Sequence, residues 1–173
     1  MLRSAKYFLN IPIISLYNTV KVGSLIDFII DPEIGKVVGI VGDKGIVRDK
    51  VKVVSMVDVR EMSNDAVIVD NEDALVSQEE IVRIDDILKL GIKIIGNKVI
   101  TESGQYLGKA IDFLLDDFFY INKLYVKPSI MNIVDSQLVI PRELIIKVTK
   151  EKIIVSDDLI KTIKEVEPVP ATQ

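Results

Sequence analysis

The sequence predicts an all-β protein made of two tandem small barrels that a short helix joins. Nearly the same ten residues occur twice, as VGSLIDFIID at 22–31 and as LGKAIDFLLD at 107–116. Short segments rich in valine and isoleucine follow each copy and are separated by turn residues, a pattern typical of small barrels and sandwiches. A helical pattern with a capping box lies between the two copies.

The two decamers indicate duplicated structure. They lie 108 − 23 = 85 residues apart, which is close to half of the 173-residue chain. Five positions are identical: Gly23/Gly108, Ile26/Ile111, Asp27/Asp112, Phe28/Phe113 and Asp31/Asp116. The alternation is strand-like, and one face of the first copy would carry Val22, Ser24, Ile26, Phe28 and Ile30. Since a two-sided pattern repeats, we expect the halves to share one structure.

Further strands are expected after each decamer. After the first copy they fall at 36–41, 51–56 and 66–70, and after the second at 122–127, 137–141 and 152–157. Asp31 and Pro32 can begin a type I turn, and Gly35 can adopt a left-handed conformation where the next strand starts. This stretch therefore predicts a tight hairpin between 22–31 and 36–41.

The segment 77–91 predicts a linker helix. Ser77 and Glu80 form a capping-box pattern, apolar residues recur on one helical face, and Gly91 supplies a C-terminal stop. A second helical pattern occupies 156–166, and the last residues are expected to be disordered. The predicted domains are a first barrel at 1–76, the linker helix at 77–91, a second barrel at 92–158, and a C-terminal helical turn with a disordered tail at 159–173.

Composition excludes several classes of function. The chain has no Cys and no His, which removes disulfides, thiolate nucleophiles, cysteine zinc sites and the usual general base. Its net charge is −4 and it has no long basic run, so nucleic acid is not an expected partner. No apolar stretch approaches the roughly 18 residues of a membrane-spanning helix, and residues 1–14 lack a signal-peptide pattern. We expect a cytoplasmic protein that does not insert into membranes.

The order of these segments resembles the PRC-barrel family, named after the H subunit of the photosynthetic reaction centre. That family has an apolar segment with a proline, a strand of the form VGkvkDvviD, a Pro/Gly turn and a return strand of the form gkVvgl. The first copy reads IPIISLYNTVKVGSLIDFIIDPEIGKVVGIVG, followed by AVIVDN. The second reads KVITESGQYLGKAIDFLLDD, followed by LVIPRELI and KIIVSD. The resemblance covers 8–73 and 92–158, and the chain resembles bacterial proteins made of two tandem PRC-barrels.

The two copies depart from the family pattern in complementary places. The segment VVSMVDV at 53–59 lacks the family's proline, and DDFFYI at 116–121 lacks the Pro/Gly turn. The resemblance implies a docking or regulatory module, since relatives include the cytoplasmic part of the reaction-centre H subunit and a domain of a ribosome maturation factor that contacts a ribosomal protein. The family has no shared catalytic motif, so no catalytic or cofactor-binding residue is assigned and no enzymatic activity is expected.

The acidic turns allow two interpretations. Asp31 with Glu33, and Asp116 with Asp117, could hold Ca²⁺ or Mg²⁺ through carboxylate oxygens. Aspartate is also preferred in turns for its local hydrogen bonds, and no segment matches a calcium-binding loop. We favour the turn interpretation and predict no metal site and no cofactor. A small-ligand or metal-binding protein remains the alternative function, and an enzyme of unknown class is a third.

Two further pairs of identical residues in the decamers each allow two interpretations. Asp27 and Asp112 are either functional carboxylates or solvated strand residues, and we favour the latter. Gly23 and Gly108 lack the companions of a phosphate-binding loop, and they predict a bulge or a close approach of another backbone.

An aromatic run marks the candidate interface. Phe118, Phe119 and Tyr120 occupy the place where the first copy has its polar turn. Three large rings cannot all enter one small barrel, so they contact either the rest of the chain or an external protein. The candidate interface comprises Phe118, Phe119, Tyr120, and Ile29 and Leu114 at the same position of the two decamers. The expected partner is a protein of unknown identity, and a homodimer is one form that it could take.

Overall fold

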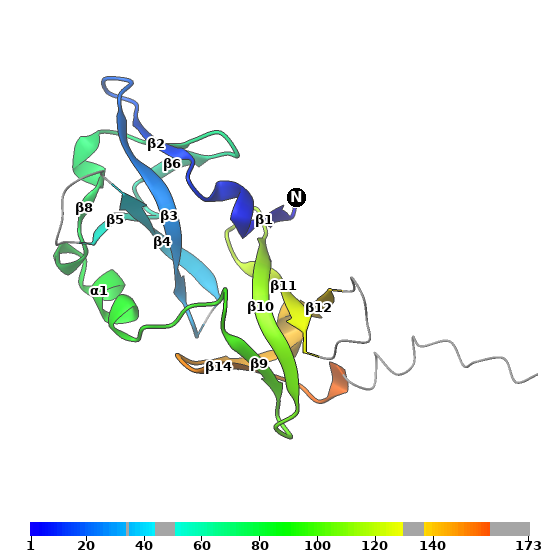
Figure 1. Cartoon of the computed structure of the whole chain (residues 1–173). Coiled ribbons are helices and arrows are strands. Elements are labelled where there is room, and N and C mark those ends of the chain that lie inside the picture. The colour runs from blue at the N-terminus through cyan, green and yellow to red at the C-terminus, as the bar shows by residue number, and fades with distance from the viewer. Residues whose placement is uncertain (34, 44–50, 130–136, 160–173) are drawn as a thin grey trace, which may run out of the picture. The chain divides into compact units, whose positions relative to one another are not determined.

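The computed structural model describes residues 1–33, 35–43, 51–129 and 137–159, and these residues form a mostly β structure with two sheets and one short α-helix (Figure 1). One of the two sheets curls into a half-barrel. The helix predicted at 156–166 and the tail lie outside the described residues from residue 160 onward.

The chain divides into two compact units. The first unit contains Met1–Ile92 together with Leu114–Ile121, and the second contains Lys93–Phe113 and the residues from Asn122 onward. The linker helix predicted at 77–91 therefore belongs to the first unit. The short segment Leu114–Ile121 comes from the second half of the sequence but also belongs to the first unit, which sequence repetition does not reveal.

The first unit contains one sheet with the strand order β6-β7-β2-β3-β4-β5-β8. Its strands are β2 (Pro12–Ser15), β3 (Lys21–Asp31), β4 (Lys36–Asp43), β5 (Lys52–Ser55), β6 (Val59–Met62), β7 (Val67–Val69) and β8 (Val76–Ser77). Three short 3₁₀ turns, Ala5–Phe8, Glu72–Ala74 and Gln78–Glu80, and the helix α1 (Val82–Lys89) complete it. Strands β2 and β7 pair in parallel, and the other neighbours pair antiparallel.

The second sheet has the strand order β12-β11-β10-β9-β14-β13. Its strands are β9 (Lys98–Thr101), β10 (Tyr106–Leu115), β11 (Ile121–Pro128), β12 (Leu138–Pro141), β13 (Ile145–Val148) and β14 (Lys152–Val155), with a 3₁₀ turn at Arg142–Leu144. The parallel pair is here β9 and β14. At the N-terminus, β1 (Arg3–Ser4) pairs with the end of β10, with Arg3 opposite Leu115 and Ser4 opposite Leu114.

The duplication predicted from the decamers is confirmed by the strand orders. The order β6-β7-β2-β3-β4-β5 matches β13-β14-β9-β10-β11-β12 strand for strand, including the parallel pair. Equivalent strands begin 85 or 86 residues apart: 98 − 12, 138 − 52 and 145 − 59 are 86, and 106 − 21, 121 − 36 and 152 − 67 are 85.

Backbone hydrogen bonds repeat with the strands. The Asn10 N–H donates to the Leu25 carbonyl at 2.7 Å, and the Gly96 N–H donates to the Ala110 carbonyl at 2.7 Å. Asn10 and Gly96 both have left-handed backbone conformations, with φ of 69° and 88°. The structural equivalence of the two copies therefore extends to positions where they have different residue types. A comparison of the two sequences does not reveal it.

The predicted hairpin is confirmed, but the predicted alternation along its first strand is wrong. Asp31 lies opposite Lys36, the Gly35 N–H donates to the Asp31 carbonyl at 2.8 Å, and Gly35 has a φ of 66°. The β3–β4 register shifts between Leu25 and Asp27 and again between Ile29 and Ile30. Ile26 has no partner on β4 at the first shift and is exposed, whereas Ile29 precedes the second shift and is buried with Val53 and Ile84.

The helix between the decamers is confirmed, although it is shorter than predicted. The capping box of Ser77 and Glu80 is present and closes the 3₁₀ turn at Gln78–Glu80, and α1 begins after it. Ile84 on α1 is buried against Ile29 and Val53 of the sheet. This apolar contact explains why the segment belongs to the first unit.

Candidate functional site

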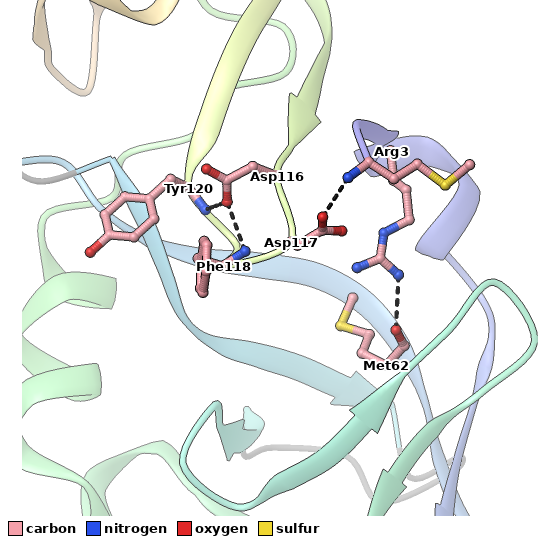
Figure 2. Close-up of polar contacts among 7 residues, drawn as sticks. Arg3, Met62, Asp116, Asp117, Phe118 and Tyr120 are labelled. Atoms are coloured by element: carbon pink, nitrogen blue, oxygen red, sulfur yellow. Dashed lines mark hydrogen bonds and ion pairs between the residues drawn. The ribbon is translucent and has the colours of Figure 1, made fainter.

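The candidate site is the turn between β10 and β11, which belongs to the first unit. The Asp116 carboxylate accepts hydrogen bonds from the backbone N–H groups of Phe118 and Tyr120, both at 2.9 Å (Figure 2). The Phe119 N–H donates to the Asp116 carbonyl at 3.0 Å, and Phe119 has a left-handed φ of 62°. Aspartate hydrogen bonds thus form this turn, although it lacks the proline and glycine of the first copy.

This turn pairs with the equivalent turn of the first copy. The Val37 N–H donates to the Phe119 carbonyl at 2.9 Å, and the Ile121 N–H donates to the Gly35 carbonyl at 2.9 Å. Lys36 and Tyr120 face each other as an antiparallel bridge between these two bonds. The Lys36 ammonium also lies 4.9 Å from the centre of the Tyr120 ring, a favourable cation–π distance.

Arg3 contacts the same turn from the N-terminal segment. Its guanidinium lies 5.7 Å from the centre of the Phe119 ring and 5.1 Å from the centre of the Phe8 ring. One guanidinium nitrogen donates to the Met62 carbonyl at 3.0 Å (Figure 2). The N-terminal ammonium of Met1 hydrogen-bonds the Asp117 carboxylate, and this contact lowers the pKa of Asp117.

The three aromatic side chains have different surroundings. Phe118 is 74% exposed, Tyr120 is 39% exposed, and Phe119 is partly buried beside Arg3. One ring therefore projects into solvent while another contacts the chain itself. Of the other two candidate interface residues, Leu114 is partly buried and Ile29 is only 1% exposed within the core. The Ile29 side chain therefore cannot contribute to an exposed surface.

The acidic candidates have structural roles in their turns and strands. The Asp31 carboxylate accepts from the Glu33 N–H at 3.0 Å and forms an ion pair with Arg83 at 2.9 Å. Asp27 and Asp112 each accept a hydrogen bond from the next residue's N–H, at 2.8 Å in both copies. Within the described part of the chain, no three acidic, histidine or cysteine side chains lie together as a metal site would require.

The paired glycines of the decamers lie where another backbone comes close. A Cβ atom on Gly108 would lie 2.0 Å from the Lys127 carbonyl oxygen, and one on Gly23 would lie 2.8 Å from the Asp43 carbonyl oxygen. The close approach predicted for these glycines is confirmed. Gly108 also follows a shift in the β9–β10 register.

Sequence reasoning did not identify Arg3 and Lys36 as neighbours of the aromatic run. Both residues lie more than eighty positions away from the rings that they contact, since 119 − 3 = 116 and 120 − 36 = 84. The available signal was that the FFY segment occupies the place of the polar turn of the first copy, and this signal located the turn but not its contacts.

Neither a membrane-spanning helix nor a similar known protein identifies a function for this site. Among the described residues, no helix is both long and apolar enough to cross a membrane. No protein-family model matches the chain, and a search of curated proteins finds no similar sequence.

Proposed function

We propose that this protein is a non-catalytic docking or regulatory module that binds another protein through the turn at 117–120. The observation that supports this proposal is that Phe118 is 74% exposed although it lies on an ordered turn. Several backbone N–H and carbonyl groups of this turn are hydrogen-bonded. A large exposed aromatic side chain on an ordered turn resembles the anchor residues of protein interfaces, which insert into apolar pockets of the partner.

The surroundings of Phe118 favour binding over a purely internal role. The Asp116 carboxylate and the pairing with the first turn restrict the backbone before any partner arrives. A partner would therefore have little backbone ordering to impose, which reduces the entropic cost of association. Tyr120, with its ring half-exposed beside Lys36, would extend the contact.

We further propose that the two halves are PRC-type barrels and that the protein acts in the cytoplasm. The repeated strand order supports the first part of this proposal, because both halves contain the strand succession that the resemblance implies. The resemblance is also the ground for expecting docking and not catalysis.

The alternative, a small-ligand or metal-binding protein, depends on the acidic turns. Asp31 forms an ion pair with Arg83, and Asp116 accepts two backbone hydrogen bonds. A cation bound at either turn would have to compete with these contacts. We therefore prefer the docking function.

A pair of serine substitutions tests the docking function. Phe118→Ser removes the exposed ring, and Tyr17→Ser is a matched control because Tyr17 is 86% exposed elsewhere in the first unit. Surface substitutions of this kind change stability by about 0.5 kcal/mol or less. We expect both variants to keep the melting temperature, and only Phe118→Ser to lose a protein co-purified with the full chain from its native cells. Equal recovery of that protein with both variants would contradict the proposal.

A further inference from the structure

The pairing of the two turns has an internal two-fold symmetry. The donors Val37 and Ile121 are related by 121 − 37 = 84, and the acceptors Gly35 and Phe119 by 119 − 35 = 84. The facing residues have the same spacing, since 120 − 36 = 84. Each hydrogen bond is thus the image of the other, and position 36 faces its own equivalent.

The backbone conformations follow the same symmetry. Gly35 and Phe119, which provide the two carbonyl acceptors, are both left-handed, with φ of 66° and 62°. A contact is isologous when both sides use the same set of groups, as in two-fold symmetric dimers. The backbone of the first turn can therefore pair with any turn of its own kind, including the same turn of a second molecule.

The side chains distinguish the internal pairing from pairing between two molecules. In the internal pair, the Lys36 ammonium lies over the Tyr120 ring at 4.9 Å. If two first turns paired, Lys36 would face Lys36 of the other molecule, and like charges directly opposite each other are unfavourable. Lys36 and Tyr120 therefore favour the internal partner and disfavour self-association.

We propose that the turn at 35–37 is a self-complementary strand-pairing site, occupied in this chain by its repeat counterpart at 119–121, and that withdrawal of this counterpart opens the site to a second copy of the protein. The inference depends on contacts inside the first unit and does not depend on the proposed docking function. It predicts a monomer while the internal pairing is intact and a two-fold dimer after it is lost.

Cysteine pairs test the internal pairing, because the natural chain has no cysteine. Facing residues between two such hydrogen bonds have Cα atoms about 4.5 Å apart, within the range that a disulfide spans. With oxidised glutathione as the oxidant, the full-length double variant Lys36→Cys/Tyr120→Cys should form an intramolecular disulfide and remain a monomer on a non-reducing gel. A mismatched control, Glu33→Cys/Tyr120→Cys, should form it much more slowly. Failure of the first pair to form this disulfide, or equal rates for both pairs, would overturn the inference.

A second experiment tests self-complementarity. Ile121→Pro removes the N–H that donates to Gly35, and Phe119→Pro, which excludes a left-handed φ, is a second way to disrupt the turn. Each substitution is combined with Lys36→Cys, and a combined variant that retains the β-sheet circular dichroism is used. It should form a dimer in which a disulfide joins position 36 of the two molecules. The single variant Lys36→Cys should stay monomeric. A folded combined variant that remains monomeric would overturn the proposal, as would equal dimer formation by Lys36→Cys alone.

Discussion

Alanine in place of Gly39 would test how closely helix α1 approaches strand β4. A Cβ atom at this position would lie 2.8 Å from Cδ1 of Ile84, 3.0 Å from the Val54 carbonyl oxygen and 3.3 Å from Cδ1 of Ile29. Overpacking of this kind costs about 1–3 kcal/mol. Alanine also lowers the entropy of the unfolded chain, which offsets about 0.4–1 kcal/mol. We expect Gly39→Ala to lower the free energy of unfolding by about 0.6–2 kcal/mol, taking the difference between the lower ends and between the upper ends of these ranges.

A double-mutant cycle identifies the contact responsible. Ile84→Val deletes the Cδ1 methyl that meets the added Cβ, and alone it should cost about 0.5–1.5 kcal/mol. The double variant Gly39→Ala/Ile84→Val should then be less destabilised than the sum of the single changes by at least about 0.5 kcal/mol. The remaining contact with the Val54 carbonyl oxygen would prevent full recovery.

Urea denaturation followed by circular dichroism measures these free energies, provided that the slope of the transition is unchanged. Gly42→Ala is a matched control, because its Cβ would meet Leu75 and Ile13 and not Ile84. The pair Gly42→Ala/Ile84→Val should therefore be additive within about 0.3–0.5 kcal/mol. If Gly39→Ala/Ile84→Val were additive as well, α1 would not approach β4 in the way described.

Two further predictions concern the glycines of the decamers and one exposed ion pair. Gly108→Ala should destabilise the protein by more than about 1 kcal/mol and by more than Gly23→Ala. Both the φ of 148° at Gly108 and the 2.0 Å distance from an added Cβ to the Lys127 carbonyl oxygen oppose a side chain there. Equal unfolding midpoints of the two variants in urea would contradict this prediction. Arg60 donates two hydrogen bonds of 2.6 Å to Asp70 and lowers its pKa, so the pair stabilises the fold above the ordinary carboxyl pKa, and this contribution is lost as the pH falls through the lowered pKa. Melting temperatures measured from about pH 5 down to about pH 2, across the ordinary carboxyl range, should therefore fall more for the natural protein than for Asp70→Asn, and parallel curves would exclude the linkage.

Features of this protein that depend on neighbouring residues follow from the sequence alone. The hairpin at Asp31–Lys36 and the capping box of Ser77 and Glu80 were both predicted, because turn chemistry and capping act over a few residues. The duplication was predictable because two halves with the same pattern of turns and apolar residues satisfy the same local preferences.

Only the tertiary structure decided which side chains are accessible and which turns meet. A bulge in β3 leaves Ile26 unpaired and exposed, and Ile29 is buried with Val53 and Ile84. A bulge is a property of paired strands that alternation along one strand does not reveal. The pairing of Lys36 with Tyr120, and the position of Arg3 beside Phe119, join residues more than eighty positions apart. Such contacts depend on how the complete sheet brings distant backbone together, so the sequence determined each turn, whereas the fold determined its partner.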